Sequence, residues 1–211
     1  MIKAIIFDLD GVIANTQQYH AQIESEILNR FGIKISLEEV TKRFAGVRTK
    51  DFLKSLLEEK KVDFNIDDIM TEKRQRINYV CSKELKSIPG VVDLIKAIYD
   101  AGLRLAVASA SSDDFVRMVL EKLEIIKYFS IVVSADEVGK GKPNPDVFLL
   151  AAQKLLVSPE DCVVIEDSYN GMQAAKAAGM KCIGLTNDKT APANLIISSF
   201  DEININIIKN L

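Results

Sequence analysis

AIIFDLDGVIANT, residues 4–16, contains the strongest structural signal in the sequence. Its apolar residues run without interruption into Asp8, and a second aspartate, Asp10, follows two positions later, just before Gly11. An apolar run rich in β-branched residues, without a period of two, is typical of a central parallel strand that is covered on both faces. The sequence therefore predicts a buried strand over residues 3–9, whose end carries two carboxylates that must repel each other.

From Pro89 onward, apolar segments typical of strands alternate with helical ones. The expected strands cover residues 103–109, 129–134, 162–166 and 181–185, with a last short strand at Ile196 and Ile197. The expected helices cover residues 91–101, 112–123, 146–156 and 168–178. This alternation predicts an α/β fold in which a parallel sheet carries helices on both faces.

The region between the first strand and Pro89 contains no recognisable strand. Apolar residues at a spacing of four predict a helix over residues 16–31. Further helix is expected over residues 51–82, with a break near 63–65. This block of helices interrupts the alternating pattern directly after its first strand.

We interpret residues 15–84 as an inserted α-helical cap domain. The core domain then consists of residues 1–14 and 85–211. The two crossings between the domains, near residues 13–15 and 83–89, are candidate hinges. A cap that moves on such hinges can close over a site at the ends of the strands.

The composition is that of a globular protein with a sizeable core. Of its 211 residues, 48% are hydrophobic and 27% are charged, and the formal net charge is -3. That charge is too small to indicate binding to nucleic acid or to a membrane surface, and no run of about 18 apolar residues predicts a membrane span. The cysteines, Cys81, Cys162 and Cys182, form no CxxC pair, so they are expected to be free thiols in a reducing cytoplasm.

Side chains that can bind a ligand or take part in catalysis follow several predicted strands at their C-terminal ends. In open parallel sheets, ligands bind beyond these ends, so residues from distant parts of the chain should converge there. The candidate residues are Asp8, Asp10, Ser109, Ala110, Ser111, Glu166 and Asp167, together with Lys142 in the loop before the helix at 146–156. Each segment alone could be an ordinary turn, helix cap or solvated loop, and only their joint order indicates a functional site.

Four acids at one edge of a sheet need a balancing charge. Two carboxylates about 4 Å apart repel each other by about 4 kcal/mol at an effective dielectric constant of about 20. A set of oxygen ligands with open positions for water suits Mg²⁺, and Lys142 supplies a further positive charge. The sequence therefore predicts a Mg²⁺ site formed by Asp8, Asp10, Glu166 and Asp167.

The same residues fit phosphoryl transfer. Asp8 is the expected nucleophile, because a carboxylate can accept a phosphoryl group as an aspartyl phosphate. Asp10 can protonate the leaving oxygen and then activate water. Ser109, with the amides of the two residues after it, can hold the phosphate, and Lys142 can pair with Asp8 and the phosphate. The predicted catalytic residues are thus Asp8, Asp10, Ser109 and Lys142.

Four segments resemble the motifs of the haloacid dehalogenase-like superfamily. They are AIIFDLDG (4–11), LAVAS (105–109), GKPNPDVF (141–148) and VVIEDSYNG (163–171). The resemblance covers nearly the whole expected core and implies a Rossmann-like sheet, an aspartyl-phosphate intermediate and Mg²⁺. In that superfamily the second aspartate separates phosphotransferases from dehalogenases, so Asp10 argues against dehalogenation.

Within the superfamily, the chain is most similar to β-phosphoglucomutase-like proteins with a helical cap. The matching segments are residues 7–20, 45–51, 107–111 and 166–174. The likeness implies that the substrate is bound by His20, Gly46, Arg48, Ala110 and Ser111. His20 is also implied to assist the proton transfer of Asp10. From the residues alone, His20 could equally be a surface or half-buried side chain, and Arg48 a solvated one.

Three positions depart from the mutase pattern. The mutase grips a second phosphate with a lysine and an arginine around the Gly46 turn of the cap, and with a Lys-Asn pair after the SAS segment. In this sequence Ala45 replaces the lysine, and Arg48 is displaced by one position. The acid Asp113 lies where the Lys-Asn pair is expected. Asp113 would repel a second phosphate, which weakens the case for mutase activity.

We expect a Mg²⁺-dependent phosphomonoester hydrolase that acts on a small phosphorylated metabolite, with a sugar phosphate as the first choice. A sugar-phosphate mutase of the β-phosphoglucomutase kind is the main alternative, and a catalytically inactive relative that binds a ligand or partner is a third. The chain is expected to act as a monomer in the cytoplasm, without nucleic acid or membrane partners. Lys73, Arg74 and Arg76 are interpreted as a solvated helix face.

Overall fold

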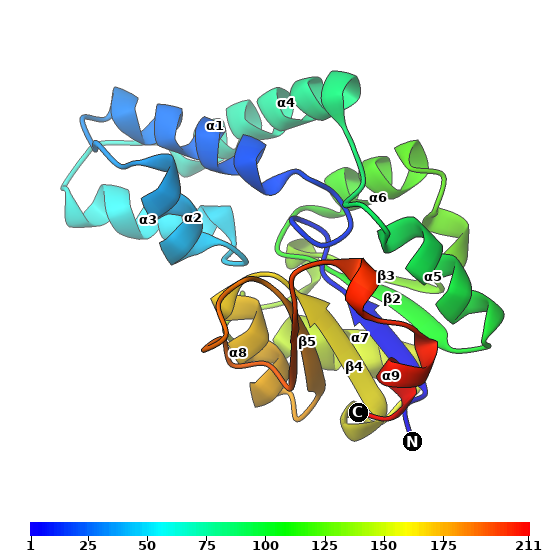
Figure 1. The fold of residues 1–211 in the computed structure, drawn as a ribbon. Coiled ribbons are helices and arrows are strands. Elements are labelled where there is room, and N and C mark those ends of the chain that lie inside the picture. The colour runs from blue at the N-terminus through cyan, green and yellow to red at the C-terminus, as the bar shows by residue number, and fades with distance from the viewer.

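The computed structural model describes all 211 residues and consists of a parallel sheet with helices on both faces and a body of helices beyond one end of it (Figure 1). The sheet has six strands in the order β3-β2-β1-β4-β5-β6. The strands are β1 (Ala4–Phe7), β2 (Arg104–Ala108), β3 (Ile131–Val133), β4 (Cys162–Glu166), β5 (Lys181–Leu185) and β6 (Leu195–Ile197). Every neighbouring pair is parallel, which confirms the expected Rossmann-like α/β fold with its inserted helical cap.

The central position of β1 follows from its sequence, because all of its side chains are apolar and buried. Phe7 pairs with Val107 of β2 on one side and with Ile165 of β4 on the other. The residues that follow these three partners therefore emerge at the same edge of the sheet. This register places Asp8 beside the ends of β2 and β4.

The side chains of β1 alternate between two apolar clusters, one on each face of the sheet. Ile5 and Phe7 join the larger cluster, with α5, α6 and α9. Ala4 and Ile6 join the smaller cluster, with α7 and α8. These core helices are α5 (Val91–Asp100), α6 (Asp113–Lys122), α7 (Asp146–Leu155), α8 (Tyr169–Ala177) and α9 (Ile205–Lys209).

The cap contains four helices and no strand, as predicted. They are α1 (Gln17–Arg30), α2 (Leu37–Phe44), α3 (Thr49–Glu59) and α4 (Ile66–Glu84). The Ser36 side chain begins α2 by accepting a hydrogen bond from the Glu39 amide at 3.1 Å, and Asn65 begins α4 in a similar way. The predicted break near residues 63–65 is confirmed, because residues 60–65 separate α3 from α4.

The prediction of a solvated helix face is wrong for Lys73. Its side chain is only 8% exposed, and its Nζ lies 2.7 Å from Oε1 of Glu24 on α1. Arg74 and Arg76, in contrast, are 53% and 34% exposed. Because α4 packs against α1, Lys73 meets a buried acid where the sequence pattern alone suggested water.

The two crossings between core and cap lie side by side. Ala14 and Ser87 form an isolated antiparallel bridge. A backbone hydrogen bond flanks this bridge on each side. The Asn15 amide donates to the Lys86 carbonyl at 3.0 Å, and the Ile88 amide donates to the Ile13 carbonyl at 2.9 Å. The chain therefore leaves and re-enters the core at one place. The cap limits at residues 15–84 stay a prediction.

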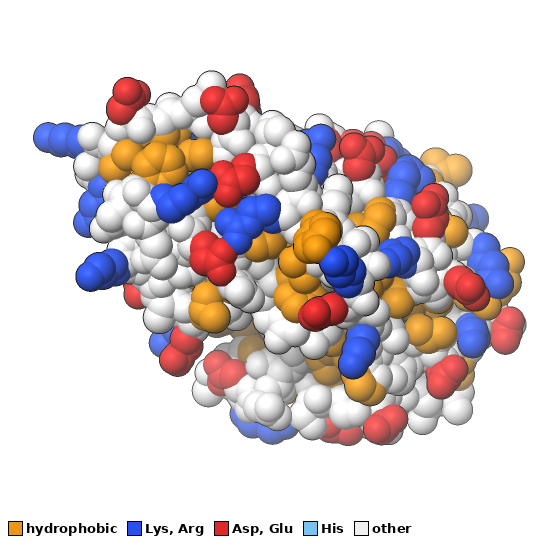
Figure 2. Space-filling view, turned by 90° about the horizontal axis from the view of Figure 1, so that it is seen from above, with side chains coloured by type: hydrophobic (Ala, Val, Ile, Leu, Met, Phe, Trp, Pro, Cys, Tyr) orange, Lys and Arg blue, Asp and Glu red, His pale blue; other side chains and the backbone are white.

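The surface carries both signs of charge. Figure 2 shows Lys and Arg side chains interspersed with Asp and Glu on one face, with apolar side chains between them. None of the helices combines the length and the apolar character that crossing a membrane would require. The three cysteines are free and buried.

Candidate active site

Three charged side chains form a buried group at the carboxyl end of the central strands. Asp8 follows β1 directly, Glu166 ends β4, and Lys142 comes from the loop before α7. The Nζ atom of Lys142 lies 2.5 Å from Oδ1 of Asp8 and 2.8 Å from Oε1 of Glu166. The fold thus brings together residues that are 134 and 24 positions apart in the chain.

Burial and charge compete within this group. Burial favours the neutral form of Lys142, but Asp8 and Glu166 outweigh it and hold the pKa of the ammonium group above its ordinary value. For Asp8, burial prevails over the attraction of Lys142 and raises the pKa of the carboxyl group to about 7. One lysine therefore does not fully stabilise the two carboxylates that it joins.

Glu166 is held by protein groups on both of its carboxylate oxygens. Oε2 accepts hydrogen bonds from the amide and the hydroxyl of Ser168, at 2.7 and 2.9 Å, and Oε1 binds Lys142. Gly171 leaves room for this arrangement, because a Cβ atom there would overlap the Glu166 carboxylate. Glu166 therefore fixes Lys142 in position.

Asp167 differs from Glu166 because its carboxylate receives no hydrogen bond from the protein. Ligand oxygens of Asp8, Glu166 and Asp167 all lie within 4.8 Å of one another. Burial, together with the neighbouring Glu166 and Asp8, raises the pKa of Asp167 well above its ordinary value. The cluster thus contains an acid without a protein hydrogen-bond donor, whose charge the nearby Lys142 offsets only in part.

This cluster fits a divalent cation. Three ionised carboxylates and one lysine leave an excess of two negative charges, which one Mg²⁺ ion would neutralise. Mg²⁺ prefers a small number of carboxylates and fills its other positions with water and phosphate oxygens. Asp8 and Asp167 fit this role because each has an oxygen without a protein hydrogen bond, whereas Glu166 has none.

Gly11 permits the close approach of Asp167 to the first loop. Its φ of +88° lies in the left-handed region, which favours glycine. A Cβ atom at this position would also overlap the Asp167 carboxylate. Both constraints explain why a glycine follows the second aspartate of the first segment.

Asp10 belongs to a different set of contacts. Its Oδ1 accepts a hydrogen bond from the Thr16 hydroxyl at 2.5 Å and lies 3.1 Å from Nε2 of His20, and its Oδ2 accepts one from the Ser111 hydroxyl at 2.8 Å. Although burial opposes them, these contacts lower the pKa of Asp10 below its ordinary value. Its carboxylate lies outside the group of three acids that could share an ion. Asp8 therefore lies with the acids of the core, whereas the carboxylate of Asp10 is bound by Thr16 and Ser111 and lies next to His20 of the cap.

The turn after β2 borders Asp10. Ser109 is fully buried, and its Oγ accepts a hydrogen bond from the Ser111 amide at 3.0 Å. The same hydroxyl lies 3.4 Å from Oδ2 of Asp10. Ala110 lines a cavity that also includes Asp8 and Asp10. The residues predicted to hold the phosphate thus lie beside both aspartates.

His20 lies in the first turns of α1 and is buried. Its ring packs edge-on against Phe115 of α6, with ring centroids 5.2 Å apart. Together with the 3.1 Å approach to Asp10, this contact joins the cap to the core. The position agrees with the implied role of His20 near the proton donor, which stays a prediction.

Gly46 lies where a cap loop touches the start of α8. Its φ is +76°, and a Cβ atom there would overlap the Ser168 hydroxyl. The side-chain amide of Asn170 donates to the carbonyl of Ala45 at 3.0 Å. Gly46 therefore allows a contact between cap and core, and Asn170 stabilises it.

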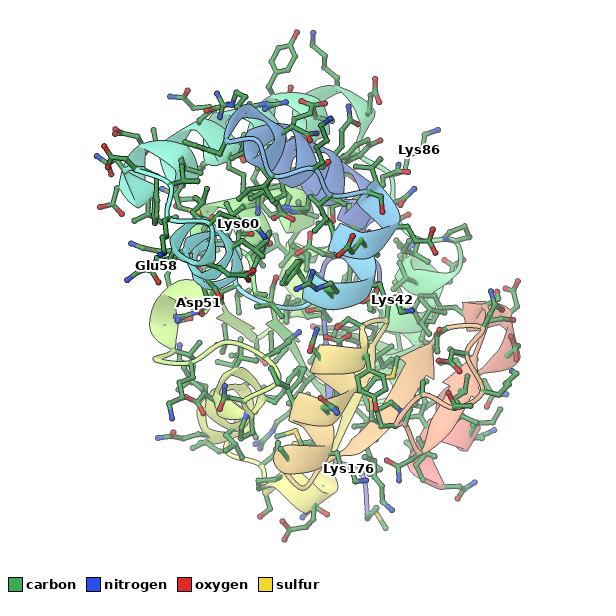
Figure 3. All side chains as sticks on the ribbon, turned by 90° about the vertical axis from the view of Figure 1, so that its left-hand side faces the viewer. Lys42, Asp51, Glu58, Lys60, Lys86 and Lys176 are labelled. Atoms are coloured by element: carbon green, nitrogen blue, oxygen red, sulfur yellow. The ribbon has the colours of Figure 1, made fainter.

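The Arg48 side chain is engaged by protein groups. It pairs with Asp51 at 2.7 Å and donates to the carbonyls of Val138 and Gly139, at 3.0 and 3.1 Å. These carbonyls belong to the loop that leads to Lys142. In Figure 3, the labelled Asp51 lies at the edge of the cap next to the core. Arg48 thus connects the cap with the lysine loop, and its implied contact with substrate stays a prediction.

The core acids and the cap enclose a small cavity. Its volume is about 30 Å³, which is enough for bound water, since one water molecule needs about 10 to 15 Å³ on this measure. The polar residues that line it include Asp8, Asp10 and Ser111 from the core, and His20, Glu24 and Thr49 from the cap. It shares residues with a wider cleft of about 680 Å³ between cap and core. A substrate larger than water therefore requires the cap to move or extends into this cleft.

Sequence reasoning missed three polar residues of the cap. Glu24 and Thr49 line the small cavity, and Lys73 lines the wider cleft and binds both of them. One signal was available, because Glu24 follows His20 by four residues and therefore lies on the same side of α1. The contacts with Thr49 and Lys73 depend on how three helices pack.

Comparisons with known proteins agree with this geometry. A family model described as haloacid dehalogenase-like hydrolase matches residues 5–185. The putative phosphatase YhcW of Bacillus subtilis is 35% identical over 204 residues, which cover 95% of this chain and 90% of that protein. A phosphorylated carbohydrates phosphatase of Thermotoga maritima is 31% identical over 182 residues, which cover 86% of this chain and 84% of that protein. The solved structure of a β-phosphoglucomutase from Clostridium difficile has a TM-score of 0.91 at 27% identity, with 100% of this chain and 96% of that chain covered. The chain therefore belongs to the haloacid dehalogenase-like hydrolases, as a phosphatase of the β-phosphoglucomutase-like group with a helical cap.

Proposed function

We propose that the protein is a Mg²⁺-dependent phosphomonoester hydrolase that acts on a small sugar phosphate through an aspartyl-phosphate intermediate. One observation supports this above all others. Lys142 binds one oxygen of Asp8, while the other oxygen, Oδ2, receives no protein hydrogen bond beside a cavity that the cap covers. The similarity to a phosphatase named for phosphorylated carbohydrates supports the substrate class.

In this proposal, Asp167 and Asp8 would hold Mg²⁺, and the Asp8 oxygen that does not bind the ion is the one that attacks phosphorus. Glu166 positions Lys142, and Asp10 is assigned to proton transfer. When bound, Mg²⁺ would offset the negative charge of the phosphate as it approaches Asp8.

In the first step, an oxygen of Asp8 attacks phosphorus, and the bond between phosphorus and the leaving oxygen breaks. Asp10 gives the leaving oxygen its proton. The contacts of Asp10 lower the pKa of its carboxyl group in the free protein, so Asp10 must take up this proton from solvent or substrate as the phosphate binds, and the negative charge of the phosphate favours that uptake. The step yields an aspartyl phosphate on Asp8 and a free alcohol.

In the second step, Asp10 takes a proton from a water molecule whose oxygen attacks phosphorus. The bond between phosphorus and Asp8 breaks, which releases phosphate and restores the carboxylate. Lys142 and Ser109 hold the phosphoryl oxygens in both steps. Because the cap of the same chain covers Asp8, the proposed enzyme needs no partner subunit to shield its site and works as a monomer. We further propose that it works in the cytoplasm, without nucleic acid or membrane partners.

The likeness to a β-phosphoglucomutase favours mutase activity as a second candidate. A mutase must hold a second phosphate at the far end of its substrate. In this chain, Arg48 is already bound to Asp51 and to core carbonyls, so it is not free to bind a second phosphate. Asp113 carries a negative charge, which would repel one. Incubation with β-glucose 1-phosphate separates the two, because a mutase forms glucose 6-phosphate and a phosphatase releases free phosphate.

A phosphate-release assay tests the main proposal. The purified chain is incubated with phosphorylated sugars, nucleotides and small acids, in Mg²⁺ and in EDTA. We expect release from sugar phosphates in Mg²⁺ and none in EDTA, with activity restored by excess Mg²⁺. Release that is equal in both conditions would contradict the Mg²⁺ site, and no release from any compound would contradict the hydrolase.

A further inference from the structure

Three cap helices each contribute one side chain to a polar cluster, two of whose members line the small cavity and one the wider cleft next to it. These are Glu24 of α1, Thr49 of α3 and Lys73 of α4, which we name the cap triad. The side chains of Glu24 and Lys73 are 7% and 8% exposed, so the ion pair is largely excluded from solvent. The Thr49 hydroxyl donates to Oε1 of Glu24 at 2.8 Å, and Nζ of Lys73 lies 2.7 Å from the same oxygen.

Glu24 keeps one oxygen without a partner. Both contacts of the cap triad use Oε1, and no protein group donates to Oε2. Glu24 lines the cavity together with Asp8 and Asp10, so a molecule in the cavity can reach it. Because no protein group occupies this oxygen, a hydroxyl group on the substrate can donate to it.

The position of Glu24 assigns it to the end of the substrate away from the phosphate. Helix α1 begins beside the core and runs away from it (Figure 1). His20 contacts Asp10, and Glu24 lies one helical turn farther, about 6 Å along the axis. A phosphate bound at Asp8 would therefore leave the far end of the molecule near the cap triad.

The charge balance of the cap triad selects the kind of group that it can bind. Glu24 and Lys73 carry one charge of each sign, so together they offer no net attraction to an ammonium group or to an anion. A second phosphate placed at the cap triad would face the free oxygen of Glu24 and would be repelled. A hydroxyl group can donate to that oxygen without adding charge.

Building on the hydrolase function proposed above, we propose that the cap triad is a specificity subsite. It binds a hydroxyl group of a monophosphorylated sugar or polyol and excludes bisphosphates. Glu24 accepts the hydroxyl hydrogen bond, while Lys73 and Thr49 hold the Glu24 carboxylate in place.

The first test compares the wild-type protein on matched probes in Mg²⁺. The hydroxylated probes are glycerol 3-phosphate, ribose 5-phosphate, glucose 6-phosphate and fructose 1-phosphate. The other probes are p-nitrophenyl phosphate, which has no free hydroxyl group, and fructose 1,6-bisphosphate. We expect kcat/KM for the best hydroxylated monophosphate to exceed the values for the other two by at least about tenfold.

Outcomes of this first test separate the two proposals. If no probe releases phosphate, the hydrolase function fails. If phosphate is released but p-nitrophenyl phosphate or the bisphosphate is the best probe, the hydrolase function stands and the subsite proposal fails.

The second test changes the cap triad. Glu24→Gln leaves one acceptor oxygen for Thr49 and Lys73, puts an NH2 donor in place of the free oxygen, and removes the counter-charge of Lys73. We expect kcat/KM for the best hydroxylated monophosphate to fall at least about tenfold relative to p-nitrophenyl phosphate, while the relative value for the bisphosphate rises. A variant that is merely misfolded would lower all three values together.

Two further variants complete the test. Thr49→Val removes the hydroxyl without exposing an unpaired charge, and we expect a smaller loss in the same direction. Glu26→Gln is the matched control, because Glu26 lies on the same helix and pairs with the partly exposed Arg76 on the surface. The subsite proposal is overturned if Glu24→Gln leaves the ratios between the probes as they are in the wild-type protein and in Glu26→Gln.

Discussion

The two halves of the site each contain a buried lysine paired with an acid, but they differ in where the lysine comes from. In the core, Lys142 joins Asp8 and Glu166 at the ends of parallel strands. In the cap, Lys73 pairs with Glu24 across two helices. The core pair is set by strand register and belongs to recognisable sequence segments. The cap pair is set by the packing of helices, and neither of its residues belongs to a recognisable sequence segment.

This difference separates the reaction from the choice of substrate. Residues at the end of β1 and β4 cannot shift without breaking the register of the sheet. Side chains on α1, α3 and α4 can change while the cap still packs. We therefore expect substitutions in the core half to affect every substrate, and substitutions in the cap half to affect substrates unequally.

The largest effect is expected for Asp8→Asn, which removes the proposed nucleophile. The amide cannot form the aspartyl phosphate, so phosphate release should fall at least about 10⁴-fold on every substrate. Enzyme assays measure the loss, and far-UV circular dichroism checks the fold. Activity within about tenfold of the wild-type value would contradict the assignment.

Asp10→Asn is expected to have the next largest effect. Loss of the proposed proton donor should lower turnover by about 10² to 10⁴-fold for substrates with a poor leaving group. The loss should be smaller for p-nitrophenyl phosphate, because its leaving group needs less help from an acid. Equal losses on both kinds of substrate would argue against a role in proton transfer.

Lys142→Met and Lys73→Met compare the two buried pairs directly. Each change leaves buried carboxylates without their cation, so each should lower the free energy of unfolding by about 3 to 5 kcal/mol in urea titrations. Lys142→Met should also lower kcat about 10² to 10³-fold on every probe, because it removes a charge next to the reacting group. If Lys73→Met lowered kcat equally on every probe, the division between the two halves would fail.

Arg48→Ala is expected to have the smallest effect. The change removes the hydrogen bonds to the carbonyls of Val138 and Gly139, so closure of the cap should become less favourable. We expect KM to rise by no more than about tenfold, with the same ranking of substrates. Arg30→Ala is a suitable control, because Arg30 pairs with Glu72 within the cap. An altered ranking of substrates would indicate that Arg48 contacts the substrate.

The sequence predicts the core of the fold well, because its strands carry a local signal. The apolar segments at 162–166 and 181–185 coincide with β4 and β5 as observed. Residues at strand ends are forced together once the sheet is parallel. For this reason the proximity of Asp8 and Glu166 could be predicted from order alone, whereas Lys142, in the loop before α7, was expected with them from the joint pattern of the segments.

The cap half could be predicted only as helices. Helical periodicity indicates which side chains share a face, but the rotation of each helix against its neighbours depends on packing. Lys73 looked solvated because two other basic residues lie near it in the sequence. Its burial against Glu24 requires α1 and α4 to meet at one particular angle. The contact of Arg48 with the carbonyl of Val138 likewise spans 90 positions and leaves no local signal.

The paired crossings between the domains limit how the enzyme can open. Because the outgoing and returning chains are joined by the bridge between Ala14 and Ser87, the cap cannot twist independently about each connection. We expect any movement of the cap to turn it as one piece about this double connection, which would separate the margin where Arg48 and the Gly46 loop contact the core. We therefore expect substrate to enter and product to leave at this margin, on the side of the cap away from the joined crossings.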